Sequence, residues 1–267
     1  MSVSPSWDPE QYERFAAERA RPFDDLVAQI PTTAVSQVVD LGCGPGTMTA
    51  TLGKRWPDAH VHGSDSSPDM ISAARRLETD RLTFELADLA EWQPAGAYDV
   101  IVSNATLQWV PQHVDLLPGW LDALRPGGSL AFQVPAPGSA GAVPVFRAVA
   151  TSPRWSSQLA QVVAGFGPQQ RSPVRTPTEY VELLAPHGTV NVWETTYSHV
   201  LDGTDPVLEW FSGTGLRPYL DALDADERAE FSDDVAKGLR EQYPQRPFGT
   251  ILPFRRIFAV VVRNAAF

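Results

Sequence analysis

Runs of apolar residues alternate with segments of helical periodicity through the first half of the chain. The strand candidates are short runs of β-branched, alternating or uniformly apolar residues, and they cover residues 35–41, 59–64, 82–87, 98–103 and 129–134. The helix candidates between them are residues 47–55, 68–77 and 114–124, where apolar side chains recur at helical spacing. Strands that alternate with helices are typical of βαβ units, so this half of the chain predicts a parallel sheet.

Proline and glycine mark the expected ends of several elements. Arg-Pro-Gly-Gly at residues 125–128 predicts a helix stop and a turn before the strand at 129–134. Residues 135–144 are rich in Pro, Gly, Ala and Ser and predict a crossing loop. Residues 145–184 have a helical pattern that prolines and glycines break, which predicts the short helices of a lid.

The last part of the chain predicts two more strands. Residues 189–201 and 254–263 are strand-like, and residues 208–243 are mostly helical with an interruption at 217–218. No tight turn joins the two strands, which favours an antiparallel edge on a parallel sheet. The fold class is therefore α/β: a Rossmann-like, doubly wound sheet of seven mostly parallel strands with an antiparallel final edge, plus N-terminal and inserted lid helices.

Composition and charge narrow the classes of partner. The chain has 267 residues, with 21 Lys and Arg against 32 Asp and Glu, which gives a formal net charge of −11. An acidic chain repels polyphosphate, so we expect no nucleic-acid partner. An anionic small substrate would need a local cluster of arginines.

Cysteine usage and apolar runs bear on the compartment. Cys43 is the only cysteine, so no intramolecular disulfide can form, which fits a reducing environment. Residues 1–21 lack the apolar core of a signal peptide, and the apolar run at 257–262 is too short to span a bilayer. We therefore expect a cytoplasmic protein with no membrane partner.

A glycine-rich loop carries the strongest chemical signal. Gly42, Gly44 and Gly46 follow a strand candidate and precede a helix candidate, where backbone can approach a ligand closely. The third glycine is misplaced for a dinucleotide fingerprint, because position 47 is Thr. Asp40, just before the loop, would repel a pyrophosphate but suits a cationic ligand such as S-adenosylmethionine. A tight turn without a ligand is the alternative.

Polar residues end the next three strand candidates. Asp65 could accept from both ribose hydroxyls of an adenosine, although a role at the cap of the following helix is the alternative. Asp88 could accept from the adenine amino group, or could be a loop carboxylate. Asn104 would face the methionine end of the cofactor. Trp109, a few residues further on, could equally be a core aromatic.

These residues resemble the class I methyltransferases that use S-adenosylmethionine, over residues 40–134. The resemblance narrows further, because the chain is similar to the trans-aconitate methyltransferases in Trp7-Asp8-Pro9, Tyr12, Phe15, Arg19, Arg21-Pro22, Asp25-Leu26 and residues 104–113, 213–219, 243–246 and 252–256. The resemblance implies transfer of a methyl group to one carboxylate of trans-aconitate, giving a monomethyl ester and S-adenosylhomocysteine. It also implies a small polycarboxylate partner and a monomer or weak homodimer.

The resemblance implies two sets of binding residues and a division of the chain. The expected cofactor-binding residues are Tyr12, Arg19, Asp40, Gly42, Gly44, Asp65, Ser66, Met70, Asp88, Leu89, Asn104, Ala105 and Trp109. The expected substrate-binding residues are Gln108, Arg217, Tyr219, Arg255 and Arg256. The expected single domain spans residues 1–267, with cofactor-covering helices at 1–30, a cofactor-binding half at 31–135, a helical lid insertion at 136–187 and a substrate-side half at 188–267.

The implied reaction needs no general base, because a carboxylate is already ionised at neutral pH. Catalysis would be positioning of the carboxylate in line with the sulfonium methyl group. Arginine holds carboxylates better than lysine, and strand alternation puts Arg255 and Arg256 on opposite faces, so one of them should point inward. A salt-bridged surface position is the alternative for each arginine, including Arg217.

The histidines are not expected to hold a metal. His60 and His62 share one strand face without completing a site, and His113 and His199 are interpreted as polar surface or cap residues. Three rival functions remain open at this point: a methyltransferase for another small acid or small molecule, a nicotinamide-dependent oxidoreductase, and a binding protein without activity.

Overall fold

The computed structural model describes residues 15–94, 96–138, 141–165 and 173–264. The predicted cofactor residue Tyr12 lies outside these ranges. The chain divides into two compact units, which we describe separately. The sheet unit comprises residues 7–137, 172–195 and 256–267, and the helical unit comprises residues 1–6, 138–171 and 196–255.

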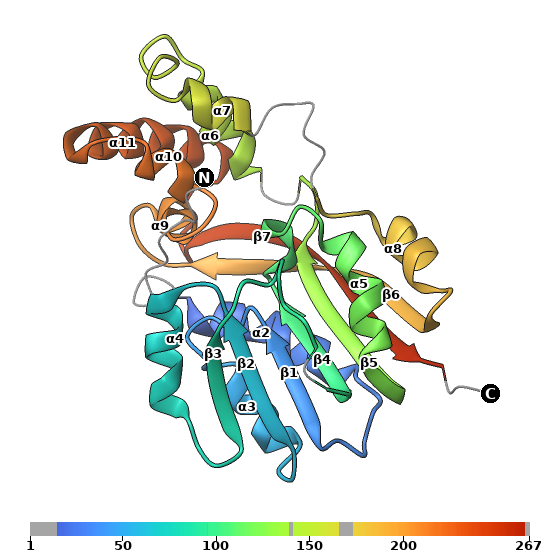
Figure 1. Cartoon of the computed structure of the whole chain (residues 1–267). Helices are drawn as coiled ribbons and strands as arrows, with labels where there is room; N and C mark the ends of the chain where they lie inside the picture. The colour runs from blue at the N-terminus through green and yellow to red at the C-terminus, as the bar shows by residue number, and fades with distance from the viewer. Residues whose placement is uncertain (1–14, 95, 139–140, 166–172, 265–267) are drawn as a thin grey trace. The chain divides into compact units, whose positions relative to one another are not determined.

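Seven strands form one sheet in the order β3-β2-β1-β4-β5-β7-β6 (Figure 1). Their bounds are β1 Gln37–Leu41, β2 His60–Asp65, β3 Leu82–Leu86, β4 Tyr98–Asn104, β5 Leu124–Pro135, β6 Gly188–Leu201 and β7 Thr250–Arg263. Strands β1 to β5 pair in parallel, whereas β7 pairs antiparallel with β5. The predicted fold class is confirmed, and the antiparallel strand lies one position in from the edge.

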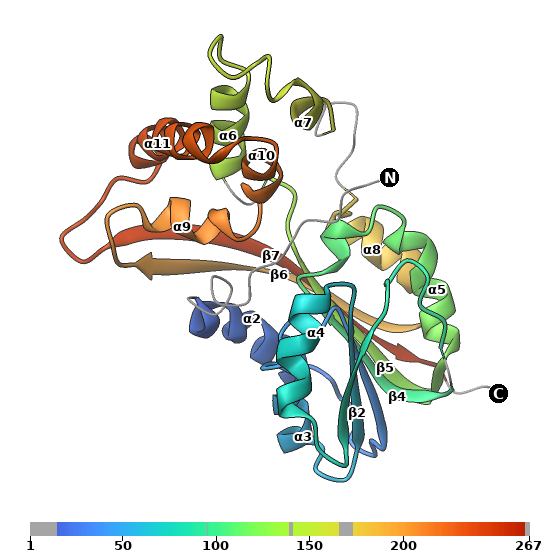
Figure 2. The ribbon, with the colours of Figure 1, turned by 60° about the vertical axis from the view of Figure 1, so that its left-hand side comes forward.

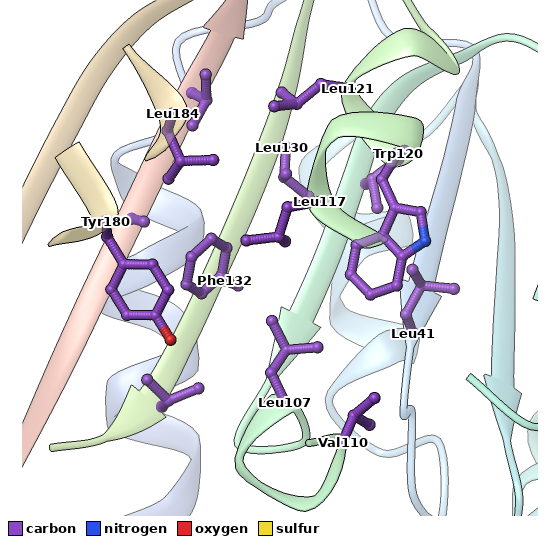
Figure 3. Close-up of a cluster of buried hydrophobic side chains, with 14 of the residues drawn as sticks. Leu41, Leu107, Val110, Leu117, Trp120, Leu121, Leu130, Phe132, Tyr180 and Leu184 are labelled. Atoms are coloured by element: carbon purple, nitrogen blue, oxygen red, sulfur yellow. The ribbon is translucent and has the colours of Figure 1, made fainter. Parts of the chain in front are cut away.

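Helices cover both faces of the sheet unit (Figure 2). The α-helices are α2 Ala16–Ala28, α3 Thr49–Arg55, α4 Pro68–Ala74, α5 His113–Asp122 and α8 Pro177–Leu184, with short 3₁₀ turns at Arg75–Leu77 and Leu107–Trp109. Helices α5 and α8 pack on one face, where Leu117, Phe132 and Tyr180 belong to one apolar core (Figure 3). Helices α2 and α3 lie on the opposite face (Figure 2). The carboxyl ends of β1, β2 and β4 therefore meet at one edge of a covered sheet.

The helical unit contains α6 Ala142–Ala150, α7 Ala160–Gly165, α9 Pro206–Ser212, α10 Arg217–Asp221 and α11 Ala225–Gln242. Helix α11 begins with a capping box, in which Asp224 and Glu227 exchange side-chain to backbone hydrogen bonds. Aromatic side chains hold the unit together: Trp155 packs edge-on against Phe231, and Tyr219 stacks on Phe231. No helix in the described part of the chain is long and apolar enough to cross a membrane.

The helix stop predicted at residues 125–128 and the interruption predicted at 217–218 each lie a few residues from the observed helix ends, since α5 ends at Asp122 and no helix covers residues 213–216. Residues 125–128 do not form a separate turn, because β5 begins at Leu124 and runs through them. The pairing with β4 shifts register there, and Gly127 has a φ of 80°, so these residues form a bulge within the strand. Residues 217–218 begin α10, since proline is favoured in the first helical turn.

The lid region predicted at residues 136–187 does contain short helices. Helices α6 and α7 belong to the helical unit, whereas α8 packs on the core of the sheet unit. Thr176 and Glu179 form a capping box at the start of α8, which explains why a helix begins there after a proline-rich stretch.

Candidate active site

The glycine loop between β1 and α3 has the backbone that its sequence requires. Gly42, Gly44 and Gly46 all have positive φ, at 82°, 56° and 79°. The amide N–H groups of Gly42 and Cys43 donate to the carbonyl of Ser64 at 2.8 and 2.9 Å. A Cβ on Gly42 would lie 2.2 Å from the Thr106 hydroxyl, so no larger residue fits between the loop and the end of β4.

Asp65, at the end of β2, holds this loop in place. One carboxylate oxygen accepts from the amide of Gly44 and the other accepts from the amide of Ser67, each at 2.9 Å. Burial raises the pKa of Asp65, while these amide bonds oppose that shift. Ser67, rather than the exposed Ser66, caps α4 by accepting from the amide of Met70 at 3.4 Å. Asp65 is thus bound to the backbone of the glycine loop and of the residue that caps α4.

Asp40 is a buried carboxylate directly before the loop. Its Oδ2 accepts from the Thr49 hydroxyl at 2.6 Å, and its Oδ1 is buried without a hydrogen-bond partner among the described residues. Burial raises the pKa of Asp40 to about 7, although the Thr49 hydrogen bond lowers it. A buried acceptor that lacks a donor is suited to a ligand that brings N–H groups.

Asn104, Gln133 and Arg256 form a hydrogen-bonded row at the carboxyl ends of β4 and β5. The Gln133 amide donates to Asn104 Oδ1 at 2.8 Å, and the Arg256 guanidinium donates to Gln133 Oε1 at 3.1 Å. Asn104 also directs its amide at the sulfur of Met48, at 3.7 Å. Sequence reasoning missed Gln133, although an amide in a buried apolar strand was a signal that could have found it.

The backbone after β4 is strained. Ala105 is the one non-glycine residue with positive φ in the described part of the chain, at 53°. Its amide donates to the carbonyl of Gln133 at 2.9 Å, and its carbonyl accepts from the Gln108 amide at 2.6 Å. Gln108 Oε1 is buried with no hydrogen-bond partner among the described residues, so it is a second acceptor that a ligand could satisfy.

Other predicted cofactor residues have mixed surroundings. Asp88 is exposed and accepts from the amide of Ala90 at 2.9 Å, which makes it part of a turn, whereas Leu89 and Met70 are core residues. Trp109 is 40% exposed, so it is not a core aromatic. Arg19, on α2, is 9% exposed.

The predicted substrate residues fall in both units. Arg256 is 5% exposed and Arg255 is exposed, so strand alternation is confirmed and Arg256 is the inward arginine. Arg217 lies 3.1 Å from the Asp221 carboxylate, and Tyr219 is buried, where burial raises its pKa. Arg217, Tyr219 and Arg255 belong to the helical unit, and their part in the substrate site stays a prediction.

The structure corrects the expectation for two histidines. His113 and His199 are buried, not surface residues. His113 Nδ1 donates to the Val110 carbonyl at 3.0 Å, and its Nε2 accepts from the Tyr180 hydroxyl at 2.9 Å. His62 pairs with Glu85 at 3.0 Å, and no group of three potential metal ligands occurs among the described residues.

Comparison with known proteins places this site in a family. Residues 38–128 match the family model of a methyltransferase domain. A trans-aconitate 2-methyltransferase of Streptomyces avermitilis is 47% identical, covering 98% of both chains. One of Rhodococcus jostii is 46% identical, covering 95% of this chain and 98% of the relative.

Solved structures support the fold. A phosphoethanolamine N-methyltransferase 2 of Haemonchus contortus, in complex with S-adenosyl-L-methionine, superposes with a TM-score of 0.56 at 13% identity. The match covers 96% of this chain and 57% of that one. Because the identity to these curated relatives extends over nearly the whole of each chain, the chain belongs to the trans-aconitate 2-methyltransferase family.

Proposed function

We propose that the chain transfers the methyl group of S-adenosylmethionine to one carboxylate of trans-aconitate. The products are a monomethyl ester and S-adenosylhomocysteine. Among the features of the site, the unpartnered buried Oδ1 of Asp40 beside the glycine loop carries the proposal. The name shared by the relatives supports the choice of acceptor.

The loop fits a cofactor with a cationic end and no phosphate. Asp40 can accept from the ammonium group of the methionine moiety through its unpartnered oxygen. Each oxygen of Asp65 accepts one amide N–H and keeps a second lone pair, so both can still accept from ribose hydroxyls. The Asp40 carboxylate beside the loop would repel a pyrophosphate, which argues against a nicotinamide dinucleotide.

The acceptor carboxylate needs positioning rather than deprotonation. One of its oxygens attacks the methyl carbon as the carbon–sulfur bond breaks, and the electron pair of that bond goes to sulfur. The cofactor supplies the electrophilic methyl group when bound. Arg256 lies at the carboxyl edge of the sheet and can pair with a substrate carboxylate.

A panel of polycarboxylates with methyl-labelled cofactor tests this function. We expect trans-aconitate to give the highest kcat/KM and a label that mild base releases, because the product is an ester. If another small acid is the better acceptor, the assigned substrate changes but the acceptor is still a carboxylate. A base-stable product from a phenol or an amine would contradict it.

We also propose that the protein acts in the cytoplasm as a monomer or weak homodimer, without nucleic acid. The net charge of −11 and the single buried cysteine support this reading. Light scattering over a range of concentrations tests the assembly state, and a stable higher oligomer would contradict it.

A further inference from the structure

Hydrogen bonds link four side chains of the sheet unit into a continuous row. They run from Met48 at the start of α3, through Asn104 and Gln133, to Arg256 on β7. Asn104 and Gln133 are opposite one another in the β4–β5 register, and Arg256 is opposite Pro135 in the β5–β7 register. Asn104, Gln133 and Arg256 are 8%, 0% and 5% exposed, so water cannot replace these contacts freely.

The chemistry of Arg256 fixes the direction of every amide in the row. A guanidinium has only donors, so Gln133 must turn its oxygen toward Arg256 and its nitrogen toward Asn104. Asn104 must then present its oxygen to Gln133, which leaves its nitrogen on the Met48 side. That nitrogen carries two hydrogens, and only one of them can be directed at Met48.

We infer that Gln133 is a positioning residue that couples the acceptor site to the cofactor site. It holds the guanidinium of Arg256 for a substrate carboxylate. It also orients Asn104 so that the amide nitrogen, not the oxygen, faces the carboxylate of the methionine moiety. The inference rests on the proposed function, because it assigns Arg256 to the acceptor and Asn104 to the cofactor.

The backbone of Gln133 strengthens the coupling. Its carbonyl accepts from the amide of Ala105, the strained residue directly after Asn104. Side chain and main chain of one residue therefore both restrain the end of β4, where the cofactor is expected.

Gln133→Glu separates positioning from a structural role. An ionised Glu accepts from Arg256 but cannot donate to Asn104, so the Asn104 amide would turn over and donate to it. The new Glu side chain and the Asn104 nitrogen then keep partners, whereas the Asn104 oxygen faces the Met48 sulfur, which cannot donate, so we expect only a modest loss of thermal stability. The turned amide presents oxygen to an anionic carboxylate, so we expect affinity for S-adenosylhomocysteine to fall about tenfold or more. The loss of affinity relative to wild-type protein at the same pH should shrink as the pH falls, because the new carboxyl gains a proton and can donate again.

Double-mutant cycles test the two contacts. In an Asn104→Ala background, Gln133→Glu should change S-adenosylhomocysteine affinity less than about twofold, measured by calorimetry. In an Arg256→Met background and at saturating cofactor, Gln133→Met should change kcat/KM for the acceptor less than about twofold, although each single change lowers it about tenfold. If the effects multiply in either cycle, Gln133 does not act through that neighbour, the two sites are not coupled and the inference is overturned.

Ser129→Ala is the matched control. Ser129 is fully buried in the middle of the same strand, and its hydroxyl bonds to the Thr32 hydroxyl, 2.6 Å away, rather than to the row. We expect lower stability with unchanged KM and cofactor affinity. If wild-type protein binds S-adenosylhomocysteine but methylates no carboxylate, the proposed function fails. The affinity cycle and the acid recovery of Gln133→Glu then decide the role of Gln133 alone.

Discussion

Asp40 carries the most perturbed carboxylate of the candidate site. Burial raises its pKa from 3.8 to about 7, so the folded protein holds this proton more tightly than the unfolded chain. Stability contributed by Asp40 is therefore greatest at low pH and declines as pH rises between about 4 and 7. A cationic ligand bound beside Asp40 lowers the pKa of this carboxyl, because the positive charge favours the ionised form.

Asp40→Asn should stabilise the protein and weaken cofactor binding. Near pH 8 the substitution removes a buried charge, so we expect the free energy of unfolding to rise by about 1–3 kcal/mol. Affinity for S-adenosylmethionine should fall at least tenfold, because the charge that faces the ammonium group is lost. Urea denaturation and calorimetry measure the two effects. In wild-type protein, affinity should weaken as pH falls below about 7.

Asp99→Asn is the control, because it should change the free energy of unfolding in the opposite direction from Asp40→Asn. Although burial opposes the shift, hydrogen bonds from Arg125 and Ser36 lower the pKa of Asp99, so its ionised form stabilises the fold. That stability is present above about pH 4 and is lost as the pH falls further. We expect Asp99→Asn to destabilise the protein near pH 8 without affecting the cofactor. A destabilised Asp40→Asn would contradict the assignment of Asp40.

Asp65→Ala should weaken S-adenosylmethionine binding by about 1.5–3 kcal/mol. The loss has two sources, since Asp65 anchors Gly44 and is the proposed ribose acceptor. Asp69→Ala, an exposed carboxylate in the first turn of α4, should leave affinity unchanged. Calorimetry that finds equal affinities for the two variants would remove Asp65 from the site.

At the scale of elements, a polar contact in the core joins α5 to α8. His113 accepts a hydrogen bond from the Tyr180 hydroxyl. Tyr180 belongs to the same apolar core as Phe132 and Leu184 (Figure 3). Burial lowers the pKa of His113, and burial raises that of Tyr180 to about 12. The folded protein thus disfavours protonated His113, and stability falls as pH drops below about 6.5.

Tyr180→Phe removes the hydroxyl and leaves His113 Nε2 buried without its donor. We expect the free energy of unfolding near pH 8 to fall by about 1–3 kcal/mol, measured in urea. The loss should shrink when His113→Phe is combined with it, because the orphaned nitrogen is then absent. Equal losses in both backgrounds would show that the contact does not join the two helices.

Two glycines in neighbouring elements should respond in opposite ways to alanine. Gly127 in the β5 bulge has a φ of 80° and open space around it, so Gly127→Ala should cost about 1 kcal/mol from backbone strain alone. Gly119 lies inside α5, also with open space, so Gly119→Ala should add about 0.5–1 kcal/mol. Thermal unfolding of both variants checks the bulge, and a stabilised Gly127→Ala would refute it.

At the scale of the whole molecule, the proposed reaction predicts a simple pH profile. The acceptor is ionised throughout the neutral range, so the single-turnover rate at saturating cofactor should be nearly flat from about pH 6 to 8.5. It should fall only on the acid side, as the substrate carboxylates take up protons. A rate that rises tenfold per pH unit between about 6 and 8 would mean that a proton must leave first. That result would contradict a carboxylate acceptor.

Local pattern determined the order of elements and the chemistry at the strand ends. The sequence was enough to predict that one edge of the sheet carries the glycine loop, Asp40, Asp65 and Asn104, because parallel strands place their carboxyl ends at the same edge. Their spacing along the chain is enough to predict this. Element ends shifted by a few residues, since caps and bulges depend on contacts that periodicity does not contain.

Only the tertiary structure decided which of the residues in the later strands and helices are buried and which side chains they contact. Alternation separates Arg255 from Arg256, but the packing of β7 between β5 and β6 selects Arg256 as the buried one. Contact between α5 and α8 brings buried His113 against Tyr180, and the strand order places Gln133 between Asn104 and Arg256. These contacts join residues far apart in the chain, so their partners follow from strand order and register rather than from local sequence.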